Sequence, residues 1–266
     1  MHAAGALATL LALAAASGDA VPFARLALVE RGVEVVARGS AWRHAVEGAP
    51  LSPGQSLRTG SDGLVRVELP WMALTLTPDS RLGFPDAVVL SAALEGGRAV
   101  VDSDRHDTLK LVTAEAEVRG RGRAVVRREG GRTLVTCLAG RFYVASGHGA
   151  VTLARGEGTV VERGRAPGAP GPAPAPPASG LWPGRDPVYV AAGEPLELRW
   201  AGAAGSYQVE LLPVGGETVL LQRDVSAPPL RIAVPWEGAF RWRVSARDGR
   251  GLEGLPSPEG LIAVAR

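Results

Sequence analysis

The chain has little of several residue types, and each scarcity narrows what it can be. Cysteine occurs once, as Cys137, so no internal disulfide can form. An unpaired cysteine in an alternating strand pattern is typical of a small buried hydrophobe, and no histidine lies near it in sequence as a catalytic partner. The main apolar run, near the N-terminus, is about 14 residues long, whereas a membrane-spanning helix needs about 20. We expect neither a disulfide framework nor a membrane span in the mature chain.

Lysine is almost absent as well. Lys110 is the one lysine among 29 basic residues, and alanine and glycine are abundant, a skew that indicates a GC-rich genome more than a polyanion-binding surface. Because 27 acidic residues leave a formal net charge of only +2, we do not expect a dedicated nucleic-acid binder. Aromatic residues make up 5% of the chain and are not interleaved with the main arginine cluster for base stacking.

Motifs for catalysis and metal binding are also missing. The serines lack a Gly-x-Ser-x-Gly elbow, and the histidines lack zinc-type spacing. Residues 102–107 gather three carboxylates and a histidine, but Arg105 lies among them, and a solvated loop is favoured over a calcium site. Asp102 and Asp104 could form an acid–base pair only beside a substrate groove, and none is identifiable. We expect no enzyme activity, no cofactor and no metal.

The N-terminal segment, residues 1–20, matches the apolar core of a secretory signal. Cleavage is expected after Ala20, and a buried helix or a misplaced start codon are the alternatives. No cysteine lies near the cleavage zone, which argues against a lipid anchor. This segment predicts export to the periplasm or cell envelope of a bacterium.

Residues 21–165 consist of short alternating segments separated by turns. Asp62-Gly63 is a strong turn signal followed at once by the alternating run 64–69, and Gly and Pro number 35 and 21 in the whole chain. Short strands at this spacing predict an all-β rolled or sandwich domain. Residues 185–266 repeat the pattern with about seven short strands, which predicts a smaller β-sandwich with Trp200 and Trp242 as core anchors.

Between the two domains, residues 166–184 are rich in Pro, Gly and Ala. Since proline has no N–H to donate to a sheet, this segment predicts an extended, semi-rigid linker. A ligand for a proline-recognition domain is the less favoured alternative.

The first domain carries a recognisable pattern. Its residues are Gly39, Trp42, Ala45, Gly48, Leu51, Gly54, Leu57-Arg58-Thr59-Gly60-Ser61-Asp62-Gly63, Leu74-Thr75-Leu76-Thr77-Pro78-Asp79-Ser80-Arg81-Leu82, Leu138-Ala139-Gly140-Arg141-Phe142-Tyr143-Val144 and Val151-Thr152-Leu153-Ala154-Arg155-Gly156-Glu157. Residues of about 28–165 thereby resemble the FecR domain family, whose founding members are periplasmic regulators that relay receptor occupancy to an anti-sigma apparatus. Residues 185–266 are similar to fibronectin type III or immunoglobulin-like modules.

The chain also departs from that family. Residues 118–125 replace the Gly-Thr-x-Phe element usual at mid-domain, and the cytoplasmic anti-sigma segment and membrane helix of regulatory members are not found. The resemblance therefore implies a fold and an envelope location more than a part in sigma-factor regulation.

Five residues are candidates for binding a partner. Arg119, Arg121 and Arg123 could hold an anionic group, although a solvated glycine turn is the favoured interpretation of this segment. Trp42 and Trp71 lie near turns, where a sugar or a protein could contact them, although core packing is more common for tryptophan.

Two functions stay open. In the first, the chain is a non-catalytic envelope scaffold that binds a protein or polysaccharide through two tethered domains, the tether raising the effective concentration of the second contact. In the alternative, it is a periplasmic sensor or regulator in an iron-dicitrate-type signalling pathway. The sequence does not indicate the oligomeric state.

Overall fold

The computed structural model describes residues 24–266 except 71, 86–90, 105–109, 203–204 and 217–218. The expected signal segment and Trp71 lie outside these residues. The described residues contain β-strands and no helix, which confirms the all-β prediction. Accordingly, no helix in this part of the chain has the length and apolarity to cross a membrane.

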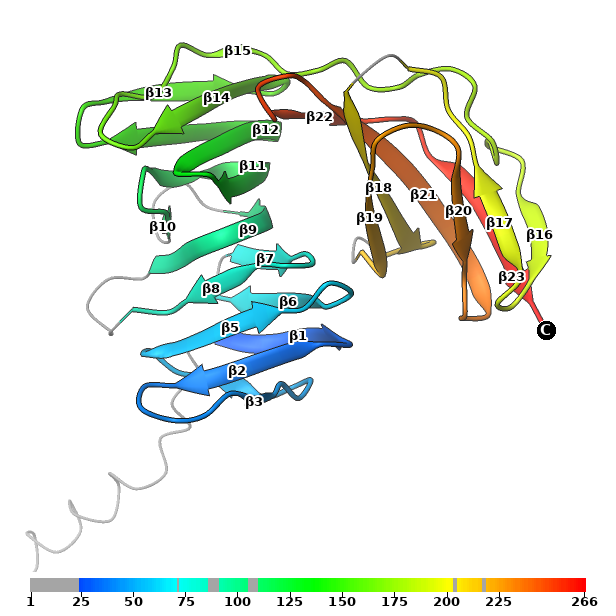
Figure 1. Ribbon diagram of the computed structural model, residues 1–266, viewed down its shortest axis with the longest axis horizontal. Helices are drawn as coiled ribbons and strands as arrows, with labels where there is room; N and C mark the ends of the chain where they lie inside the picture. Colours follow the sequence, from blue (N-terminus) through cyan, green and yellow to red (C-terminus); the bar gives the residue numbers. More distant parts are fainter. Residues whose placement is uncertain (1–23, 71, 86–90, 105–109, 203–204, 217–218) are drawn as a thin grey trace, which may run out of the picture.

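The strands form two units (Figure 1). The first, called the roll, contains β1 (Ala24–Glu30), β2 (Val33–Ala37), β3 (Arg43–His44), β4 (Pro50–Leu51), β5 (Gln55–Thr59), β6 (Leu64–Leu69), β7 (Met72–Leu76), β8 (Arg81–Gly83), β9 (Ser91–Ser103), β10 (Lys110–Val112), β11 (Glu117–Glu129), β12 (Arg132–Ser146), β13 (Gly149–Ala154), β14 (Glu157–Glu162) and β15 (Gly171–Pro172). The second, called the sandwich, contains β16 (Val188–Ala191), β17 (Pro195–Leu198), β18 (Ser206–Pro213), β19 (Leu221–Val225), β20 (Leu230–Ala233), β21 (Gly238–Arg247), β22 (Glu253–Pro256) and β23 (Gly260–Ala265).

The roll is one sheet folded into two layers. One layer contains β4, β1, β6, β7, β14 and β15, and the other contains β3, β2, β5, β8, β10 and β13. Three long strands, β9, β11 and β12, run through both layers: residues 97–103 of β9 pair in the first layer, and residues 91–96 pair in the second. Alternate residues of both layers point inward and form a single apolar core.

Two facing glycines mark the place where β11 and β12 bend between the layers. Gly122 pairs directly with Gly140, and both have positive φ, 116° and 77°. A Cβ on Gly122 would overlap the carbonyl oxygen of Ala139, so no side chain fits here. The interpretation of residues 119–123 as a glycine turn was wrong: the glycines allow a bend inside a continuous 13-residue strand.

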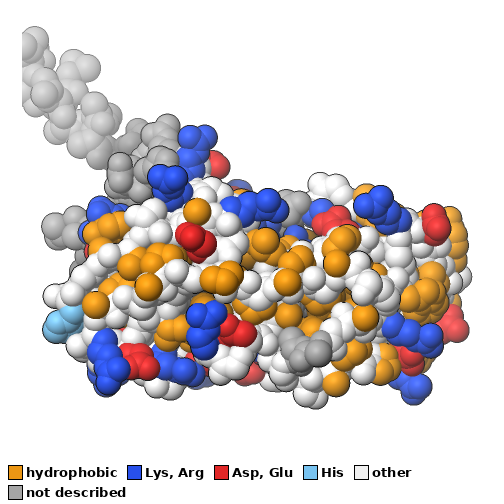
Figure 2. All heavy atoms as spheres, turned by 90° about the horizontal axis from the view of Figure 1, so that it is seen from above, with side chains coloured by type: hydrophobic (Ala, Val, Ile, Leu, Met, Phe, Trp, Pro, Cys, Tyr) orange, Lys and Arg blue, Asp and Glu red, His pale blue; other side chains and the backbone are white. Residues whose placement is uncertain are grey.

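The proline-rich segment, predicted as an extended, semi-rigid linker, also contributes a short edge strand to the roll. Its residues 171–172 form β15 at the edge of the roll, paired with β14. The N–H groups come from residues other than proline: Gly168 donates to the carbonyl of Val160 at 3.0 Å and Ala173 to that of Gly156 at 2.9 Å. An edge strand tolerates proline because only one side needs donors. Figure 2, which views this side of the molecule, shows hydrophobic side chains gathered across it.

The sandwich has a sheet in the order β16-β23-β21-β18-β19, with β22 on β21, and a facing pair β17-β20. Trp200 and Trp242 are both buried in the core that the two sheets enclose, as predicted. The Trp242 Nε1–H donates to the carbonyl of Pro183 at 3.0 Å, so this anchor also fixes the end of the linker.

Candidate functional site

The sandwich turns a polar face toward the roll. Along β18, Tyr207, Val209 and Leu211 enter the sandwich core, so Gln208 and Glu210 point to the opposite face. Such a face is normally solvated, yet Gln208 and Glu210 are buried. The two units therefore pack face to face, and the junction between them is polar.

Arg98 of β9 is the central contact of this junction. Its guanidinium forms a two-point pair with Glu253, Nε to Oε2 at 2.8 Å and Nη2 to Oε1 at 2.7 Å. It also reaches Glu210 at 3.0 Å and the side-chain oxygen of Gln222 at 3.1 Å. Only 4% of Arg98 is exposed. One arginine of the roll thus binds three strands of the sandwich.

Charge pairing keeps this buried group ionised. Glu210 also accepts from Arg243, whose Nε lies 2.8 Å from its Oε2. Burial alone would raise the pKa of Glu210, but the positive charges of Arg243 and Arg98 outweigh burial and lower it to about 2. Burial would likewise lower the pKa of Arg98, yet the charges of Glu253 and Glu210 raise it above its ordinary value.

A second ion pair lies beside the first. Arg247 holds Asp224 through two contacts of 2.8 Å, and Arg127 of the roll lies 3.6 Å from the same carboxylate. Burial would raise the pKa of Asp224, but the hydrogen bond and charge of Arg247, with the charge of Arg127, lower it instead. Asp224 therefore carries its negative charge between the two units.

Apolar side chains close the rest of the junction. Leu64 of the roll packs with Leu212 and Val219 of the sandwich in a small buried cluster. At the other end Leu252 is fully buried, and a Cβ on Gly158 would lie 3.1 Å from it. Polar pairs and apolar contacts together hold the units in one arrangement.

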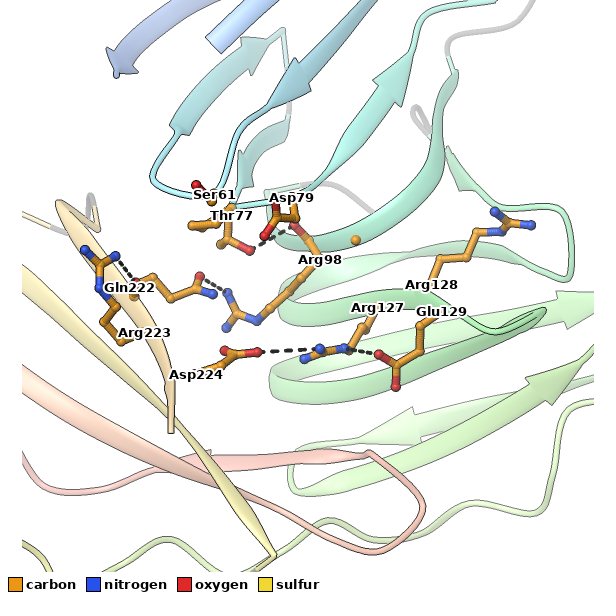
Figure 3. A pocket seen from close by; sticks show the side chains of 12 residues that line it. Ser61, Thr77, Asp79, Arg98, Arg127, Arg128, Glu129, Gln222, Arg223 and Asp224 are labelled. Atoms are coloured by element: carbon orange, nitrogen blue, oxygen red, sulfur yellow. Dashed lines mark hydrogen bonds and ion pairs between the residues drawn. The ribbon is translucent and has the colours of Figure 1, made fainter. Parts of the chain in front are cut away.

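A cleft of about 430 Å³ opens beside Arg98, with walls from both units (Figure 3). It is lined by Ser61, Thr77, Pro78, Asp79, Gly97, Arg98, Arg127, Arg128, Glu129, Gln222, Arg223 and Asp224. Most of its charges are already paired: Arg127 binds Glu129 at 2.8 Å, and Arg128 binds Glu115 outside the cleft at 2.9 Å. Among the described lining residues, Asp79 and Arg223 take part in no ion pair.

The chemistry of the cleft is that of a binding site. None of its described lining residues is a histidine or cysteine, so Ser61 and Thr77 have no imidazole beside them as a base. The Thr77 hydroxyl instead donates to the carbonyl of Arg98 at 3.4 Å. Within the described residues, no group of three or more His, Cys, Asp or Glu is placed to hold a metal ion.

A second cavity, of about 230 Å³, lies on the other side of Arg98. It is lined by Arg98, Val100, Arg123, Leu138, Ala139, Arg155, Pro176, Glu210, Arg243, Ser245, Glu253, Leu255 and Pro256. Since Arg98 and Glu210 line it, the same ion-pair network forms its floor, and the linker contributes Pro176 to its wall.

The structure separates the arginines that the sequence analysis grouped. Arg119 lies over the ring of Tyr143, 4.6 Å from its centroid, and Arg121 is exposed opposite Arg141 on β12. Arg123 lines the second cavity and lies 3.6 Å from Asp102. Only Arg123 therefore reaches the junction.

Trp42 lies away from the junction. It is half-buried, with the guanidinium of Arg58 at 4.3 Å and that of Arg81 at 5.5 Å from its ring centroid. Asp102, the other group considered for chemistry, lies between Arg66 at 3.5 Å and Arg123. The carboxylate of Asp102 is therefore paired with two arginines.

Sequence reasoning missed the residues that build the junction: Arg98, Glu210, Asp224 and Glu253. A signal did exist, because residues 206–211 and 239–244 place polar and charged side chains at every second position. That pattern identifies a face and does not say what covers it.

The fold and junction define the chain as a two-unit all-β protein with a shared polar interface. No family model and no curated protein matches it. Two crystal structures of a candidate anti-sigma factor from Parabacteroides distasonis are similar at 18% identity and a TM-score of 0.36, over 41% of this chain and 55% of theirs, so the match spans about half of that protein. Titin domains A168–A170 match at 14% identity and a TM-score of 0.27, over 94% of this chain and 91% of theirs. Likenesses this low carry no argument about function.

Proposed function

We propose that this chain is a non-catalytic binding protein of the bacterial cell envelope, exported by its N-terminal segment, that recognises a protein or polysaccharide at the junction between its two units. The observation that carries the proposal is the cleft of about 430 Å³ walled by both units. Clefts at domain interfaces are preferred places for ligands.

The ion pairs behind the cleft support a binding role. Arg98, Glu210 and Glu253 hold the roll and the sandwich in one arrangement, so the walls of the cleft are already in place before a partner arrives. A preorganised site loses less conformational entropy on binding, and affinity gains accordingly. The partner then meets one composite surface in place of two independently tethered ones.

The two charges of the cleft that form no ion pair among the described residues indicate which chemical groups a partner must present. Asp79 on the roll contributes a carboxylate, and Arg223 on the sandwich contributes a guanidinium that donates to the carbonyl of Gln222 at 2.8 Å. A partner with both donors and acceptors, such as a peptide backbone or a row of sugar hydroxyls, satisfies both walls.

Recovery of partners from envelope fractions tests the proposal. We expect Ser61→Trp, which fills the cleft, and Arg223→Glu, which reverses its charge, each to abolish recovery of the partner that the unaltered chain retains. The matched control is Arg231→Glu, because Arg231 is also an arginine of the sandwich but its side chain is 80% exposed, pairs with Glu197 within the β17–β20 sheet and does not line the cleft. Equal recovery by all three variants would refute binding at the cleft.

A signalling role is the alternative, and the resemblance of residues 28–165 to periplasmic regulators supports it. Deletion of the gene separates the two functions: a changed sigma-dependent regulon supports signalling, whereas unchanged transcription with loss of an envelope contact supports the scaffold. Hydrolysis of an envelope polymer by the purified chain would contradict both.

A further inference from the structure

The second cavity differs in chemistry from the cleft. Leu138, Leu255, Pro176 and Pro256 give it aliphatic walls, and no aromatic side chain lines it among the described residues. Its volume of about 230 Å³ is below the roughly 300–1,000 Å³ of pockets for drug-sized ligands. It has room for one aliphatic side chain and offers no platform for stacking a sugar ring.

The charges of the cavity are balanced except at one residue. Arg98 and Arg243 are neutralised by Glu210 and Glu253 on the floor. Arg123 lies 3.6 Å from Asp102. The remaining arginine, Arg155, is exposed, and among the described residues it forms no ion pair.

Strand register brings two more arginines, Arg121 and Arg141, close to Arg155 at the edge of the cavity. Arg123 of the cavity pairs with Ala139, and Arg121 pairs with Arg141 one step beyond the glycine bend. Arg141 pairs in turn with Ala154, the residue before Arg155. These pairings bring the backbone of Arg121, Arg141 and Arg155 to the corner of the roll where β11 and β12 bend.

Arg121 and Arg141 form an unusual pair. Both are exposed, they lie directly opposite each other on neighbouring strands, and within the described chain neither forms an ion pair. Like charges directly opposite on a sheet destabilise it. A bound anionic group would remove this repulsion through charge-assisted hydrogen bonds.

We propose that the second cavity and this basic corner bind an acidic peptide segment of a partner protein. An aliphatic side chain of the segment enters the cavity, and carboxylates on its flanking residues pair with Arg155, Arg121 and Arg141. The inference rests on the proposed function, because it names the kind of partner that this binding protein recognises. The site is separate from the cleft.

Selection from a randomised seven-residue peptide library displayed on phage, with the full chain as bait, tests this site. We expect the enriched peptides to contain Leu, Ile or Val with Asp or Glu within two positions on either side. A labelled peptide of the enriched sequence should bind the unaltered chain by fluorescence anisotropy and weaken as salt rises, because the flanking contacts are exposed ion pairs.

Variants connect the binding to the corner. Arg155→Gln and the double variant Arg121→Gln with Arg141→Gln should each weaken the peptide at least tenfold, while Arg155→Lys retains part of the affinity. Arg231→Gln is the control for loss of one exposed arginine elsewhere and should change nothing. All four positions are exposed, so the variants should fold, and circular dichroism checks that they do.

Three outcomes would overturn the inference: no aliphatic–acidic motif among the enriched peptides, equal affinity for all variants, or binding of labelled polygalacturonate at the corner in place of peptide. Each can be told apart from failure of the proposed function. Loss of the envelope partner with Ser61→Trp but not with Arg155→Gln would leave the cleft as the binding site and remove only the acidic-peptide site.

Discussion

The same residue type has opposite surroundings in two regions of the roll. At the junction, Arg98 is buried and its charge is matched by Glu210 and Glu253. At the corner, Arg121 and Arg141 are exposed and face each other without an ion-pair partner among the described residues. An arginine with buried carboxylates stabilises an arrangement, whereas an arginine opposite another arginine is available to a ligand. Partners and burial, more than residue type, separate structural from binding positions.

The largest effect is expected at the junction. Arg98→Met removes the positive charge that Glu210 and Glu253 contact in the buried junction. Removal of one partner of a buried ion pair costs about 3–5 kcal/mol. Urea denaturation followed by tryptophan fluorescence measures the free energy of unfolding. The double variant Arg98→Met with Glu253→Gln should recover part of the loss, because Glu253 then carries no unpaired charge and Glu210 keeps its pair with Arg243. A single variant that loses less than about 1 kcal/mol would show that the network is not structural.

Acid should weaken the same region. The pKa of Glu210 falls from 4.5 to about 2 on folding, so its stabilisation is complete above pH 4.5 and is lost as the pH falls from 4.5 toward 2. A shift of this size corresponds to about 3 kcal/mol, since one unit is about 1.4 kcal/mol. The pKa of Asp224 is also lowered, so it contributes with the same sign. Unfolding free energies measured between pH 7 and pH 2 check this, and a flat profile below pH 4.5 would contradict it.

An intermediate effect is expected at the bend that presents the corner. Gly122→Ala places a Cβ against the carbonyl of Ala139 at a φ of 116°, and such strain costs about 1–3 kcal/mol. Gly96→Ala is the matched control on β9, because a Cβ there meets nothing within 4 Å. Thermal unfolding of the two variants compares them. Equal melting temperatures would mean that the bend does not need glycine.

The smallest effect, and one of opposite sign, is expected at the corner itself. Arg121→Gln removes a like-charge contact with Arg141, so the chain should become more stable by about 0.2–1 kcal/mol. The gain should shrink in high salt, which screens the repulsion between exposed charges. A loss of stability in Arg121→Gln would show that this arginine is structural, as Arg98 is.

Local patterns were enough to predict much of this fold. Alternation gave the strands of both units and placed Trp200 and Trp242 in a core, because a period of two reports directly on a sheet with one buried face. The prediction of a turn at residues 119–123 was wrong, because glycines that end a strand and glycines that bend one look alike in sequence. Only the pairing of Gly122 with Gly140 on another strand distinguishes them.

The junction could not be predicted from the sequence, for a different reason. Arg98 contacts Glu210 and Glu253, which lie 112 and 155 residues further along the chain. No local pattern reports which two faces will meet over such separations. Arg119, Arg121 and Arg123 form a group in the sequence because they lie close together, whereas Arg141 and Arg155 join Arg121 only through strand register.

The three long strands, β9, β11 and β12, determine how the roll unfolds. Because β9, β11 and β12 belong to both layers, the layers cannot separate by sliding or peeling as two independent sheets would. Opening either layer breaks strands on which the other depends, so backbone amides near residues 97–103 and 122–128 should exchange with solvent only when the whole roll unfolds. Shared strands make the roll a single cooperative unit.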